Sequence, residues 1–135
     1  MKVHTAQRAG SAVNVDRVFC THNAVIMLDG ATAFEPVDVD PATYADTLGR
    51  SIANQLDHHP DAALADVVAT AITTTADQLH LRPGWSPSST ITILRARDAA
   101  ADLYVLGDSP IHYGTNHATS VFTAVSYTHL SLPTN

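Results

Sequence analysis

The chain has 135 residues, and its 7 Lys and Arg against 13 Asp and Glu give a formal charge of −6 with histidine neutral. That length predicts a single domain, and 45% hydrophobic residues with only 15% charged exclude an intrinsically disordered protein. Nucleic-acid backbones are bound by clustered Lys and Arg. The acidic balance, with one lysine and scattered arginines, therefore argues against a nucleic-acid partner.

Two absences in the sequence indicate the compartment. Cys20 is the only cysteine, so an internal disulfide is impossible. Residues 1–10 lack the apolar segment of a signal peptide, and the apolar run at 24–28 is far too short to cross a membrane. We expect a cytoplasmic protein without membrane contact.

The first third of the chain predicts short strands. Residues 3–6 are a candidate strand, and the β-leaning residues 17–21 precede the apolar run 24–28. His22 and Asn23 between them supply turn chemistry. We expect a hairpin over 17–28.

The middle third predicts two helices. Pro41 suits the first helical position and Asp40 can cap the free amides before it. The first helix is expected to end at 58–60, and Asp61 is the expected cap of the second. Apolar residues at helical spacing mark one stripe on each helix: Tyr44, Leu48, Ile52 and Leu56, then Leu64, Val67, Val68, Ala71, Ile72 and Leu79. The short connection predicts an antiparallel pair.

Beyond a loop rich in proline and glycine at 82–87, the period of the apolar residues changes to two. This alternation predicts strands at 90–94, 103–106 and 110–113. Strands, then two helices, then strands favour the α+β class over a βαβ repeat.

Three aspartates occupy strand ends. Asp29 and Asp108 directly follow apolar strands, each beside a glycine, and Asp16 precedes one. If these carboxylates converge at one sheet edge, their repulsion calls for a cation, and hard oxygen ligands suit Mg²⁺ or Mn²⁺. Each Asp taken alone is also explained as an ordinary turn residue.

Four segments together resemble the successive motifs of the PPM-type (protein phosphatase 2C) serine/threonine phosphatases, in a divergent actinobacterial-like branch. The segments are Asn14-Val15-Asp16-Arg17, Val25-Ile26-Met27-Leu28-Asp29-Gly30, Ser88-Ser89-Thr90 and Val105-Leu106-Gly107-Asp108-Ser109. That family also places two helices between its second and third motifs. The resemblance covers about residues 3–113. It implies an antiparallel β-sandwich flanked by two antiparallel helices.

The resemblance also implies roles for single residues. Asp29 matches an aspartate that bridges two metal ions, and the Gly30 carbonyl matches a ligand of one of them. Asp16 matches an aspartate that acts largely through bound water, and Asp108 one at an additional, weaker metal site. The implied catalytic residues are Asp16 and Asp29, and the implied reaction is hydrolysis of phosphoserine or phosphothreonine in a protein by a water that Mg²⁺ or Mn²⁺ activates.

The sequence departs from the family pattern at several positions. Val15 stands where an acid is usual, and Pro110 where an arginine often follows. Ser11 falls at the place of a phosphate-binding arginine, which leaves Arg8 as the nearby substitute. The family's later aspartates have no counterpart after Asp108. The alternative is a catalytically silent relative, a pseudophosphatase that acts as a binding or regulatory module.

The last segment, 125–135, has no convincing period and resembles a translated sequencing adapter. We expect residues 1–124 to form a partial phosphatase domain, incomplete at its C-terminus. We expect 125–135 to be non-native or disordered, with the native protein continuing past roughly Thr123.

Two other chemistries fit the sequence less well. Gly107-Asp108-Ser109 is compatible with a serine-hydrolase nucleophile, with His112 or His117 as its base, but the order of parts is unusual for that mechanism. Among the eight histidines, the adjacent His58 and His59 point to different helix faces and cannot form a zinc-ligand pair.

Overall fold

The computed structural model describes residues 1–9, 13–31, 37–115 and 117–123, and the backbone of 126–131. Within these residues the secondary structure follows the order strands, helices, strands. The elements are β1 (Arg17–Cys20), β2 (Ala24–Leu28), β3 (Gly30–Ala31), α1 (Pro41–His58), α2 (Leu64–Gln78), β4 (Ser88–Ser89), β5 (Ile91–Ala96), β6 (Ala100–Leu106), β7 (Ile111–Thr115), β8 (Ala118–Phe122) and β9 (Ser126–Ser131).

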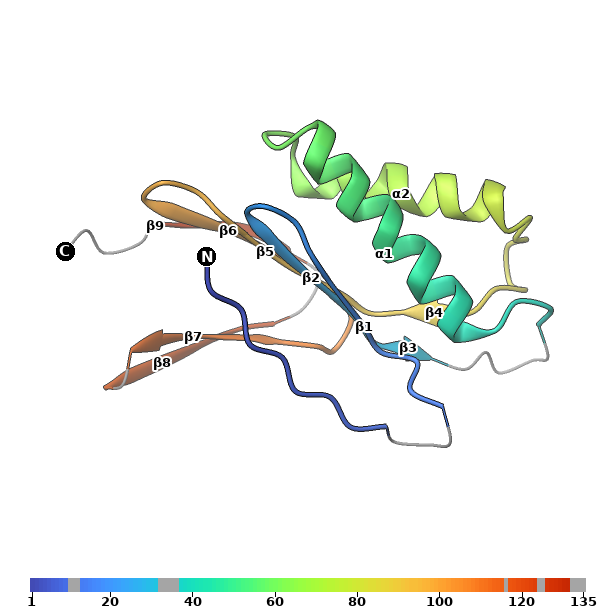
Figure 1. Ribbon diagram of the computed structural model, residues 1–135, viewed down its shortest axis with the longest axis horizontal. Helices are drawn as coiled ribbons and strands as arrows, with labels where there is room; N and C mark the ends of the chain where they lie inside the picture. Colours follow the sequence, from blue (N-terminus) through green and yellow to red (C-terminus); the bar gives the residue numbers. More distant parts are fainter. Residues whose placement is uncertain (10–12, 32–36, 116, 124–125, 132–135) are drawn as a thin grey trace.

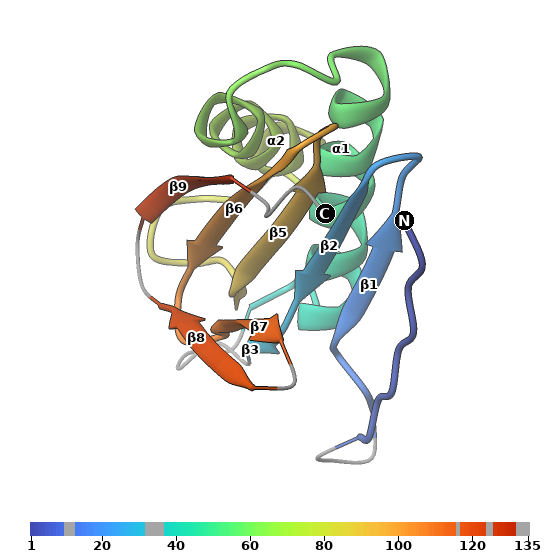
Figure 2. The same ribbon diagram turned by 90° about the vertical axis from the view of Figure 1, so that its left-hand side faces the viewer.

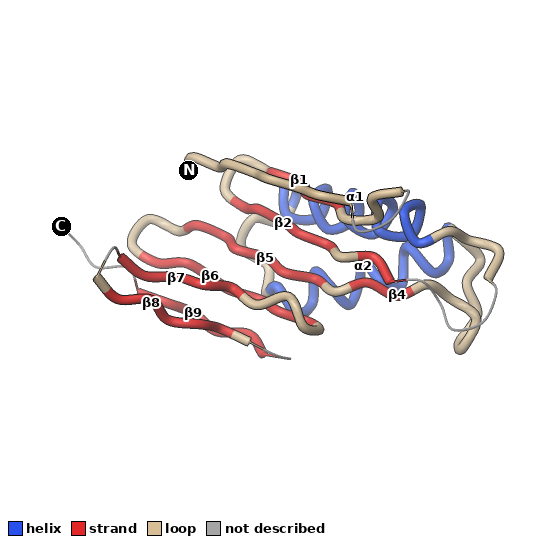
Figure 3. Tube along the Cα trace, turned by 90° about the horizontal axis from the view of Figure 1, so that it is seen from below, coloured by secondary structure: helices blue, strands red, loops and turns tan. Residues whose placement is uncertain are grey.

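The centre of the fold is a five-stranded antiparallel sheet with the order β1-β2-β5-β6-β9 (Figure 2). Both helices cover one face of this sheet, and the β7–β8 hairpin lies on the side opposite to them (Figures 1 and 3). The short strands β3 and β4 pair beside the end of α1. The expected α+β class with antiparallel sheets and two helices is confirmed, and the second layer consists of the two-stranded β7–β8 sheet.

Helix α1 begins and ends where its sequence predicts. The Asp40 side chain caps it by accepting hydrogen bonds from the amides of Ala42 and Thr43, both at 3.0 Å. Pro41 occupies its first position, where a missing N–H is harmless. Of the predicted apolar stripe, Leu48, Ile52 and Leu56 are fully buried and Tyr44 is half-buried against the core.

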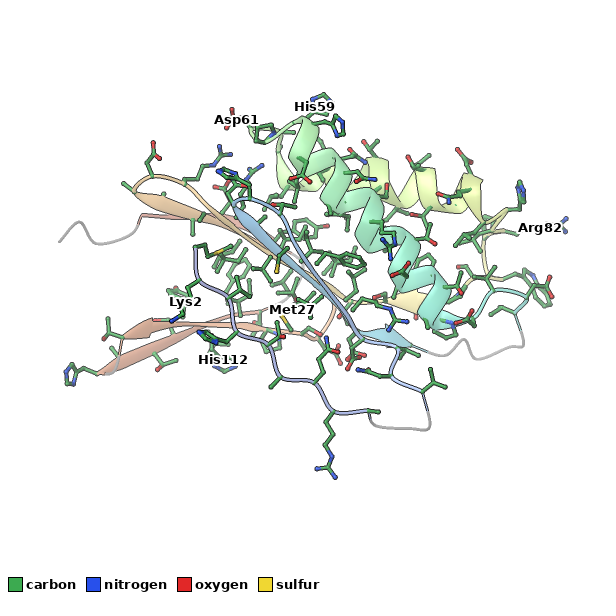
Figure 4. All side chains as sticks on the ribbon, in the orientation of Figure 1. Lys2, Met27, His59, Asp61, Arg82 and His112 are labelled. Carbon is green, nitrogen blue, oxygen red and sulfur yellow. The ribbon has the colours of Figure 1, made fainter. Side chains whose placement is uncertain are left out.

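Helix α2 begins later than predicted. Its N-cap is Ala63, which offers no side-chain hydrogen bond, so the expectation that Asp61 caps this helix is wrong. Asp61 forms an ion pair with Arg97 in the turn between β5 and β6 instead. Figure 4 shows Asp61 beside His59 at the outer end of the helix pair. The α2 stripe is buried, with Leu64, Val67, Val68 and Ala71 in the core. None of the helices in the described part of the chain is long and apolar enough to span a membrane.

The alternation of side chains along the strands separates the two faces of the sheet. In β2, Ala24, Ile26 and Leu28 are buried under the helices, whereas Met27 points the other way and is 50% exposed. The backbone of α1 packs tightly against the sheet at Gly49, where an added Cβ would lie 2.0 Å from the ring of Phe19. A side chain of any size at this position would push the helix off the β1–β2 hairpin.

One terminal segment differs from its predicted conformation, and the other contributes an edge strand. Residues 3–6 lie along the sheet but do not join the hydrogen-bond ladder of any described strand, so the candidate strand is not formed. In the tail, the backbone of Ser126–Ser131 forms β9 against the edge of β6. The other residues of the 125–135 segment, 125 and 132–135, lie outside the described part of the chain.

A buried ion pair joins the sheet to the turn between the helices. Arg95 on β5 and Asp102 on β6 are 0% and 1% exposed, and Arg95 donates to Asp102 Oδ2 from Nε at 2.9 Å and from Nη2 at 2.6 Å. The Nη1 of Arg95 donates to the carbonyls of Pro60 and Ala62 at 2.9 and 2.7 Å. Arg97 adds a further bond to Asp102. The guanidinium thus ties the α1–α2 connection to the sheet.

This network predicts a large loss of stability from a single substitution. Asp102→Ala leaves the Arg95 charge buried without its carboxylate, which should lower the free energy of unfolding by about 3–5 kcal/mol. Asp61→Ala is the matched control, because its 88% exposed carboxylate pairs with Arg97 in solvent and should contribute less than about 1 kcal/mol. Urea denaturation followed by circular dichroism measures both, and equal losses would contradict the assignment.

Candidate functional site

The register of the first hairpin brings Asp16 and Asp29 together. Arg17 pairs with Leu28 as the last rung of the β1–β2 ladder. Asp16 and Asp29 are the next residue on each strand, so they face each other at the open end of the hairpin. Residues that are opposite in this way have Cβ atoms about 4.5–5.5 Å apart. The two carboxylates therefore form a pair across the hairpin.

The titration of Asp29 reflects this pairing. Its pKa is raised above the ordinary value, first by desolvation and then by a hydrogen bond to the Asp16 carboxyl and the negative charge of Asp16. The charge of Asp108 raises the pKa of Asp29 further. Asp16 and Asp108 therefore both lie within electrostatic reach of Asp29, and only Asp16 is close enough to share a hydrogen bond with it.

Thr90 anchors Asp29 to the neighbouring strand. The Asp29 amide donates to Thr90 Oγ1 at 3.3 Å, and the Thr90 amide donates to the Asp29 carbonyl at 2.9 Å. Thr90 Oγ1 also shares a 2.8 Å hydrogen bond with Ser109 Oγ. Gly107, at a positive φ of 100°, lies so close that an added Cβ would come within 2.8 Å of the Thr90 methyl. Thr90 thus links the loop that carries Asp108 to the end of β2.

Gly30 and Asp108 lie on either side of this anchor. Gly30 is buried in β3 opposite Ser89, and an added Cβ would lie 3.1 Å from the Val15 carbonyl oxygen. A side chain at this position would be tightly packed against the segment that precedes β1. Asp108 is exposed at the start of the loop before β7.

The carboxylate pair opens into a cleft of about 440 Å³ between the N-terminal segment and the sheet. One wall is the segment 3–8, which includes Arg8, and the other wall is formed by β1 and β2, including Met27. Asp16, Asp29, Thr90 and Ser109 lie along the same cleft. Of the predicted site residues, the structure therefore brings Arg8, Asp16 and Asp29 to one cleft, with Asp108 outside its lining.

The chemistry of the pair fits a divalent cation. Two oxygen-bearing side chains face each other, and desolvation, followed by the hydrogen bond to Asp16 and the repulsion from it, raises the pKa of Asp29. A bound cation would relieve that repulsion. Across the described residues, however, no group of three or more His, Cys, Asp or Glu side chains is placed to hold a metal ion. The pair thus supplies two carboxylate ligands, which is fewer than a complete metal coordination shell.

The two other chemistries that the sequence allows gain no support. Ser109 Oγ bonds Thr90, and no hydrogen bond within the described residues joins it to a histidine. The Nδ1 of His58 contacts the Asn54 carbonyl at the end of α1, at 2.7 Å. This is the ordinary position of a solvated imidazole at a helix C-terminus.

Sequence reasoning missed three parts of the site. They are the anchoring role of Thr90, the cleft wall formed by residues 3–8, and the hydrogen bond from the Asp16 amide to the Asn14 side chain at 3.0 Å. Asn14 two residues before Asp16 is a signal for an Asx turn, so this bond was accessible to sequence reasoning. The other two depend on contacts between distant segments.

No family model matches the sequence, and no curated protein matches it either. Solved structures do match. PppA, a regulatory component of T6SS in Pseudomonas aeruginosa, aligns with a TM-score of 0.66 and 16% identity over 90% of this chain and 66% of its own. The PPM Ser-Thr phosphatase MsPP from Mycobacterium smegmatis, in complex with cacodylate, aligns with a TM-score of 0.65 and 16% identity over 89% of this chain and 50% of its own.

A third match is the catalytic domain of the serine/threonine protein phosphatase PstP in complex with two manganese ions, with a TM-score of 0.63 and 16% identity over 89% of this chain. The chain spans 53% of that structure, and about half to two thirds of the matched structures in general. At this identity the likeness is one of fold. The chain has the fold of the PPM-type serine/threonine phosphatases, as the four sequence motifs predict.

The raised pKa of Asp29 predicts how stability depends on pH. The contribution of this group is fully present below the unfolded pKa of about 4 and is lost as pH rises through the raised folded pKa. In metal-free buffer, Asp29→Asn should therefore stabilise the protein at pH 7 and have little effect near pH 3. Because Asp29 is exposed, solvent screens the repulsion, and the gain should be about 0.5 kcal/mol.

Urea denaturation at pH 3 and pH 7 with a chelator present measures this difference. Asp98→Asn, an exposed residue in the turn between β5 and β6, is the control and should show no such pH-dependent gain. A loss of stability in Asp29→Asn at pH 7 would contradict the account of the pair.

Proposed function

We propose that the protein is a metal-dependent phosphomonoester hydrolase that acts on phosphoserine or phosphothreonine in proteins, with Asp16 and Asp29 as its catalytic carboxylates. The observation that carries the proposal is the pair of carboxylates that face each other at a cleft. The phosphatase fold supports the reaction class, and the two manganese ions in one matched structure support Mg²⁺ or Mn²⁺ as the cofactor.

In this proposal Asp16 and Asp29 hold the divalent cation, with the Gly30 carbonyl as a further ligand and Asp108 as a nearby charge. The bound cation supplies positive charge that neutralises phosphate oxygens and lowers the pKa of a water molecule. Thr90 keeps the backbone of Asp29 in place through its two hydrogen bonds. No side chain of the protein is needed as a nucleophile.

Arg8 is proposed to bind the phosphate of the substrate. Its side chain is exposed and lines the cleft that holds Asp16 and Asp29. A guanidinium presents several donors to phosphate oxygens, and it offsets the negative charge that would otherwise repel a phosphorylated peptide from an acidic protein. The likeness to serine/threonine protein phosphatases supports a phosphoprotein as the substrate.

The second candidate is a pseudophosphatase that binds a phosphoprotein without hydrolysing it. The observation that favours it is the lack, among described residues, of a third carboxylate or imidazole at the Asp16–Asp29 pair. The two candidates differ in turnover: both predict that the cleft binds phosphopeptides, and only the first predicts metal-dependent release of phosphate.

Hydrolysis of an aryl phosphate such as p-nitrophenyl phosphate tests the proposal. We expect release that depends on Mn²⁺ and is lost with a chelator, and Asp29→Asn should lower it by about 100-fold or more, the usual effect of removing one key electrostatic group. Asp98→Asn is the control and should keep full activity. Because Asp29→Asn is also expected to be more stable without metal, its loss of activity cannot be attributed to unfolding.

Unchanged turnover in Asp29→Asn would remove this residue from the mechanism. Binding of a phosphopeptide without any turnover would support the pseudophosphatase instead.

A further inference from the structure

Asn14, two residues before Asp16, makes three hydrogen bonds, two through its side chain and one through its backbone carbonyl. Its Oδ1 accepts from the Asp16 amide at 3.0 Å, and its backbone carbonyl accepts from Nη1 of Arg17 at 3.0 Å. Its Nδ2 donates to Oε1 of Gln7 at 3.2 Å. Because the Asp16 amide can only donate, the carboxamide of Asn14 is held in one orientation, which leaves Nδ2 free to donate to Gln7.

These bonds fix the backbone of Asp16 from two directions. The Asn14 side chain closes a turn on the Asp16 amide, and Nη1 of Arg17 donates to the Asp16 carbonyl at 2.8 Å. Asp16 lies outside the β1–β2 ladder, which ends at Arg17. Without these bonds the residue would be free to turn its carboxylate away from Asp29, as the repulsion between the two favours. The turn at Asn14 therefore holds together a pair that electrostatics would separate.

The same side chain connects the pair to the far wall of the cleft. Gln7 belongs to the segment 3–8, which forms that wall without strand pairing. The hydrogen bond from Asn14 Nδ2 to the Gln7 side chain joins this segment to the turn before β1. Asn14 thus touches both the wall of the cleft and the backbone of Asp16.

We propose that Asn14 is a positioning residue for the divalent cation: it holds Asp16 opposite Asp29 and ties the 3–8 wall to the same point through Gln7. The inference rests on the proposed function, since it concerns how the chain prepares its carboxylates for the cation. It extends that function with a residue that itself binds neither metal nor phosphate.

The test compares five forms of the 135-residue chain: unaltered, Asn14→Ala, Asn14→Asp, Gln7→Ala and Asn23→Ala. Asn23 is the matched control, because its Nδ2 also donates a hydrogen bond, in this case to the Ala96 carbonyl at 3.3 Å, at the opposite end of the same hairpin. Two readouts are needed. Hydrogen exchange of the Asp16 amide in metal-free buffer reports the turn, and calorimetric titration with MnCl₂ reports the cation affinity.

We expect Asn14→Ala to speed exchange of the Asp16 amide and to weaken Mn²⁺ binding by about 10-fold or more, the usual effect of removing a residue that orients a metal ligand. Gln7→Ala should weaken binding less, and since Gln7 is exposed in a segment without strand pairing, this variant remains informative should Asn14→Ala fail to fold. Asn23→Ala should match the unaltered chain in both readouts. Asn14→Asp keeps the acceptor for the Asp16 amide and should restore the slow exchange.

The outcomes separate the inference from the proposed function. If the unaltered chain binds Mn²⁺ and Asn14→Ala and Gln7→Ala bind it equally well, the positioning role is overturned and the proposed function stands. If the unaltered chain binds no Mn²⁺, the proposed function fails and the inference fails with it. Equal weakening in Asn14→Ala and Asn23→Ala would show a general loss of hairpin stability and would also overturn the inference.

Discussion

The pairing of two like charges at the open end of the β1–β2 hairpin is the constraint on which the rest of the site depends. Because Arg17 pairs with Leu28, Asp16 and Asp29 are the next residues on the two facing strands and lie opposite each other. Repulsion between solvent-exposed charges of this kind is worth about 0.2–1 kcal/mol. The hydrogen bonds of Asp16 to Asn14 and of Asp29 to Thr90 contribute about 0.5–1.5 kcal/mol each. The hydrogen bonds outweigh the repulsion, so the two carboxylates stay opposite each other without a ligand. A bound cation would then stabilise the protein by removing the repulsion.

The pair can be held this way because the hairpin lies on a rigid base. Ile26 and Leu28 of β2 are buried under the helices, and each such side chain contributes about 1.5–3 kcal/mol through burial. Gly49 lets α1 settle directly on Phe19 of β1. At the other end of the sheet, Arg95 and Asp102 fix the connection between the helices. The helical layer thus prevents the hairpin from slipping in register, which would separate Asp16 from Asp29.

The parts of the fold that were predicted from sequence are those specified by local signals. Asp40, Pro41 and the four-residue spacing of Leu48, Ile52 and Leu56 define α1 without reference to anything else in the chain. The apolar run 24–28 after turn residues predicts the hairpin. Its register then determines the Asp16–Asp29 pair.

The sequence-based predictions fail where contacts between residues far apart in the chain determine the structure. Asp61 has the composition of a helix cap, but Arg97 on another part of the chain pairs with it instead. Residues 3–6 have a strand-like composition but do not pair with β1, the edge strand of the sheet. The roles of Thr90 and of the 3–8 wall depend on the meeting of segments separated by dozens of residues. The local sequence does not indicate these tertiary contacts.

A double-mutant cycle on Asp16 and Asp29 tests the central claim most directly. In chelator at pH 7, Asp16→Asn and Asp29→Asn should each raise the free energy of unfolding, and the double variant should gain less than the two gains together, by about 0.5 kcal/mol. Added Mn²⁺ should stabilise the unaltered chain and leave the double variant unchanged. Strictly additive effects in chelator, together with equal responses of the two forms to Mn²⁺, would contradict the account.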